Sequence, residues 1–228
     1  MNWFCANRFG ARRWVPACVC CTAVGMFLAG CRRESPDGPA AAAAPKVASA
    51  NRGGSVDPDH PVVEINTNLG AIRVQLDAVN APGTVQNFLN YVGDRFYDGT
   101  LFHYVAADKM IVGGGFTADG QPKPAGTTVR NEAHNGLTNL RGTIAAARDA
   151  AAGIDNATSQ FFVNLVDSPA FDHRGDTAEE YGYCVFGKVV DGLDVADSIS
   201  HAPTRDGGGD LVQTPDPPVV IKSIRVVQ

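Results

Sequence analysis

The chain has 228 residues, of which 44% are hydrophobic and 19% charged, which suits one domain with a buried core plus additional segments. Nineteen basic and 24 acidic residues give a net charge of −5, which argues against non-specific nucleic-acid binding because that requires a basic surface. The 25 glycines and 14 prolines favour a domain rich in strands and loops, and the six cysteines match in number three disulfides.

The first 30 residues predict a lipoprotein signal peptide. Five of the six cysteines lie within the first 31 residues, a segment that holds three arginines and no acidic residue and ends in an uncharged run over 14–30. A positive segment followed by an apolar one is typical of a secretory signal. The run closes with Leu28-Ala29-Gly30-Cys31, which resembles the lipobox of bacterial lipoproteins. We therefore expect cleavage before Cys31 and lipidation of its thiol.

Two other interpretations of this segment remain. The 17-residue apolar run reaches the lower limit for an uncleaved transmembrane anchor. A metal site at Cys18, Cys20 and Cys21 is the weaker alternative, because these cysteines lie inside the apolar run without histidine or acidic partners. With Cys31 acylated, only Cys184 remains as a thiol, so we expect no disulfide within the mature chain. Arg32, the residue after the lipidated cysteine, resembles a sorting signal for the outer membrane, facing the periplasm.

Residues 31–60 predict a flexible tether. The segment contains an alanine run, several prolines and a Gly-Gly-Ser sequence, and it shows no hydrophobic period. We expect the folded domain to span residues 61–228.

The domain begins with a predicted hairpin, because apolar and polar residues alternate over 62–66 and 71–76 on either side of Asn68-Leu69-Gly70. Val85, Phe88, Leu89 and Val92 then recur with the spacing of an amphipathic helix, which Gly93 ends. A second short helix is expected over 193–199. The remaining apolar runs predict six further strands, over 100–105, 110–113, 142–147, 160–165, 184–190 and 219–227.

Eight strands and two short helices in 61–228 indicate a sandwich or a closed barrel. In a barrel of eight strands, the two helices would cover the open ends.

Several short runs resemble the signature segments of cyclophilins, a family of peptidyl-prolyl cis-trans isomerases, and most closely those of its bacterial branch. The runs are Phe102-His103, Met110, Gly113-Gly114, Asn131-Glu132, Gly136-Leu137, Arg141-Gly142, Ser159-Gln160-Phe161-Phe162 and Val185-Phe186-Gly187-Lys188-Val189. The resemblance covers essentially all of 61–228. It implies an all-β fold with two capping helices, built as a closed eight-stranded antiparallel β-barrel.

The resemblance also implies a chemistry that uses neither metal nor cofactor. An X-Pro bond isomerises over a barrier of about 18–20 kcal/mol that arises from amide resonance. Catalysis requires preferential binding of the twisted amide. The family's catalytic positions match His103, Tyr104 and Gln160, of which Gln160 bonds the substrate backbone. The family's substrate-binding positions match Met110, Val112, Ala147, Arg148, Phe162, Phe171 and Tyr183, with Ala170 as the alternative to Phe171.

Three positions depart from the family pattern. The family has arginine, its catalytic cation, where this chain has Tyr104, a glutamine in place of Val112, and an aromatic residue in place of Lys109. A tyrosine donates one neutral hydrogen bond, whereas a guanidinium offers five charged donors. We therefore expect a weakened isomerase, for which Lys109 or Arg148 could supply a substitute cation. Taken without the resemblance, Met110 and Phe162 would be core residues and His103 a structural histidine.

Two functions follow from the sequence. The first is an envelope isomerase, lipid-anchored and monomeric, that acts on proline-containing polypeptides. The second is a non-catalytic, chaperone-like module that holds proline-containing segments. Tyr104 and Val112 favour the second, whereas Met110, Gln160 and Phe162 are compatible with both.

Overall fold

The first two strands form the predicted hairpin of the barrel wall. In the computed structural model, which describes residues 57–228, β1 (Val62–Thr67) and β2 (Ala71–Leu76) bury alternate residues, as the alternation of apolar and polar residues requires. Thr67 closes the turn, since its backbone N–H and its hydroxyl both donate to the carbonyl of Gly70 at 2.8 Å. The predicted signal peptide, Cys31 and most of the tether lie outside the described residues.

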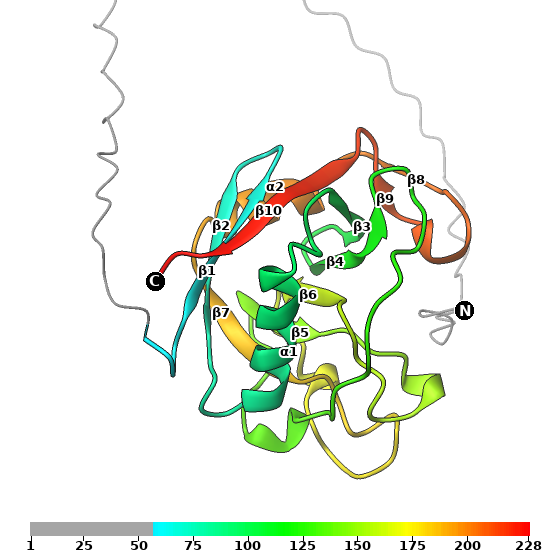
Figure 1. Cartoon of the computed structure of the whole chain (residues 1–228). Coiled ribbons are helices and arrows are strands. Elements are labelled where there is room, and N and C mark those ends of the chain that lie inside the picture. Colours follow the sequence, from blue (N-terminus) through cyan, green and yellow to red (C-terminus); the bar gives the residue numbers. More distant parts are fainter. Residues whose placement is uncertain (1–56) are drawn as a thin grey trace, which may run out of the picture. The chain divides into compact units, whose positions relative to one another are not determined.

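Eight strands close into an antiparallel barrel in the order β1-β10-β3-β4-β6-β5-β7-β2 (Figure 1). The other six strands are β3 (Thr100–Ala106), β4 (Met110–Thr117), β5 (Thr143–Ala146), β6 (Phe161–Asn164), β7 (Val185–Asp191) and β10 (Val219–Val226). This confirms the predicted eight-stranded barrel. The sequence did not predict the two-stranded ribbon of β8 (Thr204–Arg205) and β9 (Thr214–Pro215), and β4 extends four residues beyond the predicted strand.

Helix α1 (Pro82–Gly93) packs its apolar face on the barrel through Val85, Phe88 and Val92. Its first turn is capped from a distant part of the chain. The Glu132 carboxylate accepts hydrogen bonds from the backbone N–H groups of Gly83 and Thr84, at 3.0 and 2.9 Å. A carboxylate at this position satisfies free N–H donors and complements the helix dipole.

Helix α2 (Leu193–Ser200) begins directly after β7. The turn between them needs a glycine: Gly192 has a φ of +79°, and a Cβ on it would lie 2.2 Å from the carbonyl oxygen of Ala71. The remaining helical elements are single 3₁₀ turns, at Ala133–Asn135, Ala150–Ala152, Pro169–Phe171 and Gly209–Leu211. Within the described residues, no helix has the length and apolar character needed to span a membrane.

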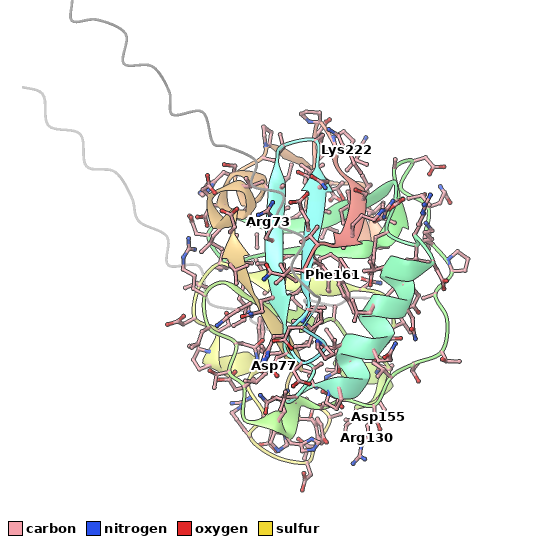
Figure 2. The ribbon with its side chains drawn as sticks, turned by 60° about the vertical axis from the view of Figure 1, so that its left-hand side comes forward. Arg73, Asp77, Arg130, Asp155, Phe161 and Lys222 are labelled. Atoms are coloured by element: carbon pink, nitrogen blue, oxygen red, sulfur yellow. The ribbon has the colours of Figure 1, made fainter. Side chains whose placement is uncertain are left out.

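The core of the barrel contains a cluster of aromatic rings among aliphatic side chains. The ring of Phe88, on α1, lies 5.6 Å from that of Phe161 and 5.3 Å from that of Phe186, centroid to centroid. Tyr97 completes the cluster at 5.6 Å from Phe161, and Figure 2 shows Phe161 in the interior, next to α1. Cys184 is the free thiol predicted for the fold. It is buried beside the hydroxyl of Thr84, and burial raises its pKa to about 11, so it stays protonated and inert.

A second, smaller hydrophobic cluster is separate from the main core. Four buried residues form it, and four partly exposed residues pack against them. The set is Ala145, Ala147, Phe162 and Val185 with Val112, Leu137, Phe171 and Tyr183. Because side chains alternate across a strand, Phe161 points into the barrel and Phe162 points into this outer cluster.

Candidate active site

The outer cluster is built on a row of residues that face one another across four neighbouring strands. Tyr104 on β3 pairs with Val112 on β4, Val112 pairs with Phe162 on β6, and Phe162 pairs with Ala145 on β5. Residues directly opposite in adjacent strands share a face of the sheet. The register therefore brings the predicted site residues Tyr104, Val112 and Phe162 together on one face.

A β-bulge on β3 places Tyr104 in this row. Phe102 and Val105 both lie in the main core, and the register between β3 and β4 shifts between Phe102 and Tyr104. A bulge adds one residue on one strand and re-aims the side chains that follow. Without it, Phe102 and Tyr104 would face the same side. The side chain of Tyr104 is half-buried, and this burial raises its pKa, so the phenol is neutral at pH 7.

Met110 begins β4 at the edge of the row. It is 7% exposed and pairs with Asn164 on β6 and Ala106 on β3. As the residue two positions before Val112, it lies on the same face of the strand. Met110, Val112 and Phe162 thus contribute an unbranched, a branched and an aromatic side chain to one apolar surface, which suits a proline ring.

Three aromatic rings pack edge to face at the side of this surface. Phe162, Phe171 and Tyr183 have centroid separations of 5.8 Å (Phe162–Phe171), 5.5 Å (Phe162–Tyr183) and 5.1 Å (Phe171–Tyr183). Phe171 ends a 3₁₀ turn in which Ala170 is exposed. The structure thus brings Phe171, rather than Ala170, into the apolar cluster, as the sequence-based assignment expected.

Arg148 anchors the loops around Tyr183. Its guanidinium donates to the carbonyls of Gly182, Gly153 and Ala178 at 2.8, 2.9 and 2.6 Å, and it lies 5.1 Å from the centre of the Tyr183 ring. The residue is only 2% exposed. Its charge is therefore engaged with backbone carbonyls, and the residue positions the aromatic side of the cluster. This placement argues against the hypothesis that Arg148 supplies a substitute cation.

Gln160 precedes β6 next to the row. Its side chain lies flat over Gly115, where an added Cβ would come within 2.6 Å of the Gln160 Cδ. The Gln160 carbonyl accepts a hydrogen bond from the backbone N–H of Ala147 at 2.9 Å, which joins these two predicted site residues at one end of β5 and β6. The Gln160 side chain is partly exposed, so its amide can reach the backbone of a bound peptide.

His103 is buried behind the surface. It is 4% exposed, its ring lies 4.6 Å from that of Phe116, and its Nδ1 has no hydrogen-bond partner within the described residues. Burial lowers its pKa to about 4, so the imidazole is neutral at pH 7. Because so little of it is accessible, the ring is part of the protein interior next to the site.

Lys109 is exposed at the turn between β3 and β4, beside Met110. Its backbone N–H donates to the carbonyl of Ala106, and its carbonyl accepts from Leu165. The turn therefore holds its backbone at the margin of the cluster.

Three members of the outer cluster were not predicted as site residues: Ala145, Leu137 and Val185. Leu137 and Val185 belong to signature runs, yet only the fold shows that they are part of this cluster. Gly115, whose missing side chain makes room for Gln160, was also not predicted. The three successive glycines at 113–115 were the available signal.

In the described residues, 57–228, no group of three metal-ligating side chains occurs.

Comparison with known proteins gives one family. The sequence model of the cyclophilin-type peptidyl-prolyl cis-trans isomerases matches residues 62–226. Peptidyl-prolyl cis-trans isomerase A of Dickeya dadantii is 45% identical over 166 residues, which cover 73% of this chain and 84% of that protein. Peptidyl-prolyl cis-trans isomerase B of Escherichia coli is 42% identical over 165 residues, which cover 72% of this chain and 99% of that protein.

The solved structures agree on the fold. A crystal structure of a cyclophilin-type peptidyl-prolyl cis-trans isomerase from Cryptosporidium parvum matches with a TM-score of 0.58 at 23% identity, over 73% of this chain and 97% of that chain. At this level of identity, the match supports the barrel and its two helices.

Proposed function

The chain belongs to the cyclophilin-type peptidyl-prolyl cis-trans isomerases, and we propose that it isomerises X-Pro bonds of exported polypeptides in the bacterial cell envelope, more slowly than relatives that carry the family arginine. The observation that carries the proposal is the row from Tyr104 through Val112 to Phe162, flanked by Gln160. This row offers an apolar surface for a proline ring beside an amide for the substrate backbone.

The proposed mechanism is non-covalent. The proline ring packs on Met110, Val112 and Phe162, while the Gln160 amide bonds the peptide backbone next to the reacting bond. Holding the ring and the flanking backbone fixes two sides of the amide and favours the twisted geometry over either planar isomer, which lowers the barrier.

The lower rate of isomerisation follows from the absence of a positive charge at Tyr104. Pyramidalisation of the proline nitrogen is favoured by a nearby cation, and the side chain in that place is the neutral phenol of Tyr104. The guanidinium of Arg148 does not replace this cation, because it is engaged with three backbone carbonyls. Loss of one preorganised electrostatic donor typically costs a factor of about 10²–10³ in rate.

A protease-coupled assay of an X-Pro peptide with the purified protein tests this proposal. We expect a measurable kcat/KM, well below that of an arginine-bearing relative such as the Escherichia coli protein. A rate equal to the relative's would contradict the weakened site. The alternative, a non-catalytic binding module favoured by Tyr104 and Val112, requires peptide binding by calorimetry with no acceleration of the isomerisation.

The location in the envelope rests on the sequence alone. We propose that Cys31 carries the lipid, and that Arg32 after it directs the protein to the outer membrane, facing the periplasm. Radiolabelled palmitate should enter the wild-type protein and should not enter the Cys31→Ser variant. Recovery of that variant still tied to the membrane would indicate an uncleaved anchor. We also propose a monomer, which sedimentation of the delipidated protein tests.

A further inference from the structure

A cleft of about 530 Å³ lies beside the outer cluster, on the opposite side from Tyr104. We call it the side cleft. It lies between the loop at 136–140 and the strands β2 and β7. Its apolar lining consists of Leu76, Leu137, Leu140 and Val185. Figure 2 shows Asp77, one of its polar lining residues, just beyond the end of β2.

The side cleft and the outer cluster share two residues. Ala145, the last residue of the row described above, pairs with Val185 on β7, and Val185 also lines the cleft. Leu137 likewise belongs to both, because it packs against the outer cluster while it lines the cleft. One apolar cluster thus reaches from Phe162 to the wall of the cleft, with Ala145 and Val185 buried within it and Leu137 partly exposed over it.

The length of this connection fits a peptide. Val185 is two strands away from Phe162, and adjacent strands lie about 4.8 Å apart, so the separation is about 10 Å. An extended chain rises about 3.3 Å per residue. A peptide that places its proline on Phe162 and passes over the partly exposed Leu137 towards β7 therefore reaches the side cleft with its third residue from the proline.

We propose that the side cleft binds an apolar side chain of the substrate polypeptide, about three residues from the proline. The proposal rests on the proposed function, since it takes the proline to sit on Phe162. Leucines and a valine line the floor. The rim carries Lys188, Asp77 and His60, of which Lys188 is exposed. An apolar floor with a polar rim of both charge signs suits an unfolded chain that brings an apolar side chain on a polar backbone.

Leu140 allows a clean test because it lines the cleft and is 51% exposed, so its replacement leaves the core intact. Leu69, 49% exposed in the turn between β1 and β2, is the matched control. The variants are Leu140→Glu and Leu69→Glu, with Leu140→Ser as a milder second change. None of these residues belongs to the proposed catalytic surface.

The substrates are a tetrapeptide with a central X-Pro bond and nine-residue peptides with leucine or serine three residues before or after the proline. Both kcat/KM and Kd, the latter by calorimetry, are measured. For the wild type and Leu69→Glu, we expect leucine to be preferred over serine by about five- to tenfold at one of the two positions. In Leu140→Glu this ratio should approach one, with tetrapeptide turnover unchanged.

Each outcome is decisive for one claim. If the tetrapeptide is turned over but the wild type treats leucine and serine peptides alike, the side cleft does not bind substrate. The same conclusion follows if Leu140→Glu and Leu140→Ser both keep the preference for leucine over serine. If the tetrapeptide is not turned over, the proposed function fails. In that case a preference in Kd that Leu140→Glu removes still supports peptide binding in the cleft.

Discussion

Tyr104 lies directly opposite Val112 across the β3–β4 pair, so two of the three departures from the family pattern are neighbours on the outer face of the barrel. Their joint replacement is therefore the direct test of the weakened site. We expect Tyr104→Arg with Val112→Gln to raise kcat/KM in the protease-coupled assay by at least about tenfold, because the pair restores a charged donor.

Val190→Gln is the control for this pair, since Val190 is an exposed valine on β7, away from the row. It should leave kcat/KM unchanged. A double variant that folds like the wild type and shows no gain would mean that the reacting bond does not lie beside Tyr104.

Gly115→Ala should reduce activity through Gln160. The added methyl group would overlap the Gln160 side chain at 2.6 Å, and this flexible side chain can move away at little cost in stability. We expect kcat/KM to fall about tenfold while the free energy of unfolding changes by less than about 1 kcal/mol.

A double-variant cycle checks that route. Gln160→Ala alone should give a similar loss, and Gly115→Ala should add nothing to it because both act through one side chain. Gly93→Ala, at the end of α1 where an added Cβ meets nothing within 4 Å, should be neutral. Additive losses in the double variant would show that Gly115 acts independently of Gln160.

Arg148→Met should destabilise the domain. The substitution keeps an apolar stem but removes three hydrogen bonds from a charged group to the carbonyls of Gly182, Gly153 and Ala178. We expect a loss of about 2–4 kcal/mol in urea unfolding, and a higher KM because Tyr183 loses its support. Arg130→Met, at an exposed arginine (Figure 2), should change neither, and an equal effect of both would remove the special role of Arg148.

The burial of His103 predicts that the folded protein loses stability at acid pH. Its pKa is about 4 in the folded protein and about 6.5 when unfolded, so between these values the unfolded state binds the extra proton. The stability due to its burial is complete above pH 6.5 and is lost as the pH falls towards 4, about 3 kcal/mol in all.

The pH effect is measured as a difference, because carboxylates titrate in the same range. Urea unfolding at pH 7 and pH 4.5 should show a smaller acid loss for His103→Gln than for the wild type. His134→Gln, at an exposed histidine, should follow the wild type. Parallel losses in all three proteins would mean that the imidazole of His103 is accessible to protons in the folded state.

The sequence predicts the barrel well because the pattern is local. Alternation along 62–66 and 71–76 and the helical spacing from Val85 to Val92 are both confirmed as elements. The segment between α2 and β10 was not predicted, since β8 and β9 are two residues long and β9 packs against β3, which is distant in sequence. For the same reason the choice of a closed barrel over a sandwich came from the family resemblance.

The candidate site was likewise predicted only where local motifs define it. Motif resemblance named Phe162, Gln160 and Tyr183, but the role of Arg148 depends on two loops that only the fold brings together. The bulge at His103–Tyr104 was also beyond the sequence, because nothing in the local pattern tells a bulge from a regular strand. The side cleft required the β5–β7 register, which no single segment contains.

Closure of the barrel has a consequence for the proposed action on incompletely folded chains. An open sheet ends in strands whose free N–H and C=O groups invite another chain to add itself as a further strand, which is a route to aggregation. All eight barrel strands here have a neighbour on both sides. Unfolded chains can therefore be held on the outer face through side-chain contacts and a few hydrogen bonds, and be released again, without the barrel serving as a template for their assembly.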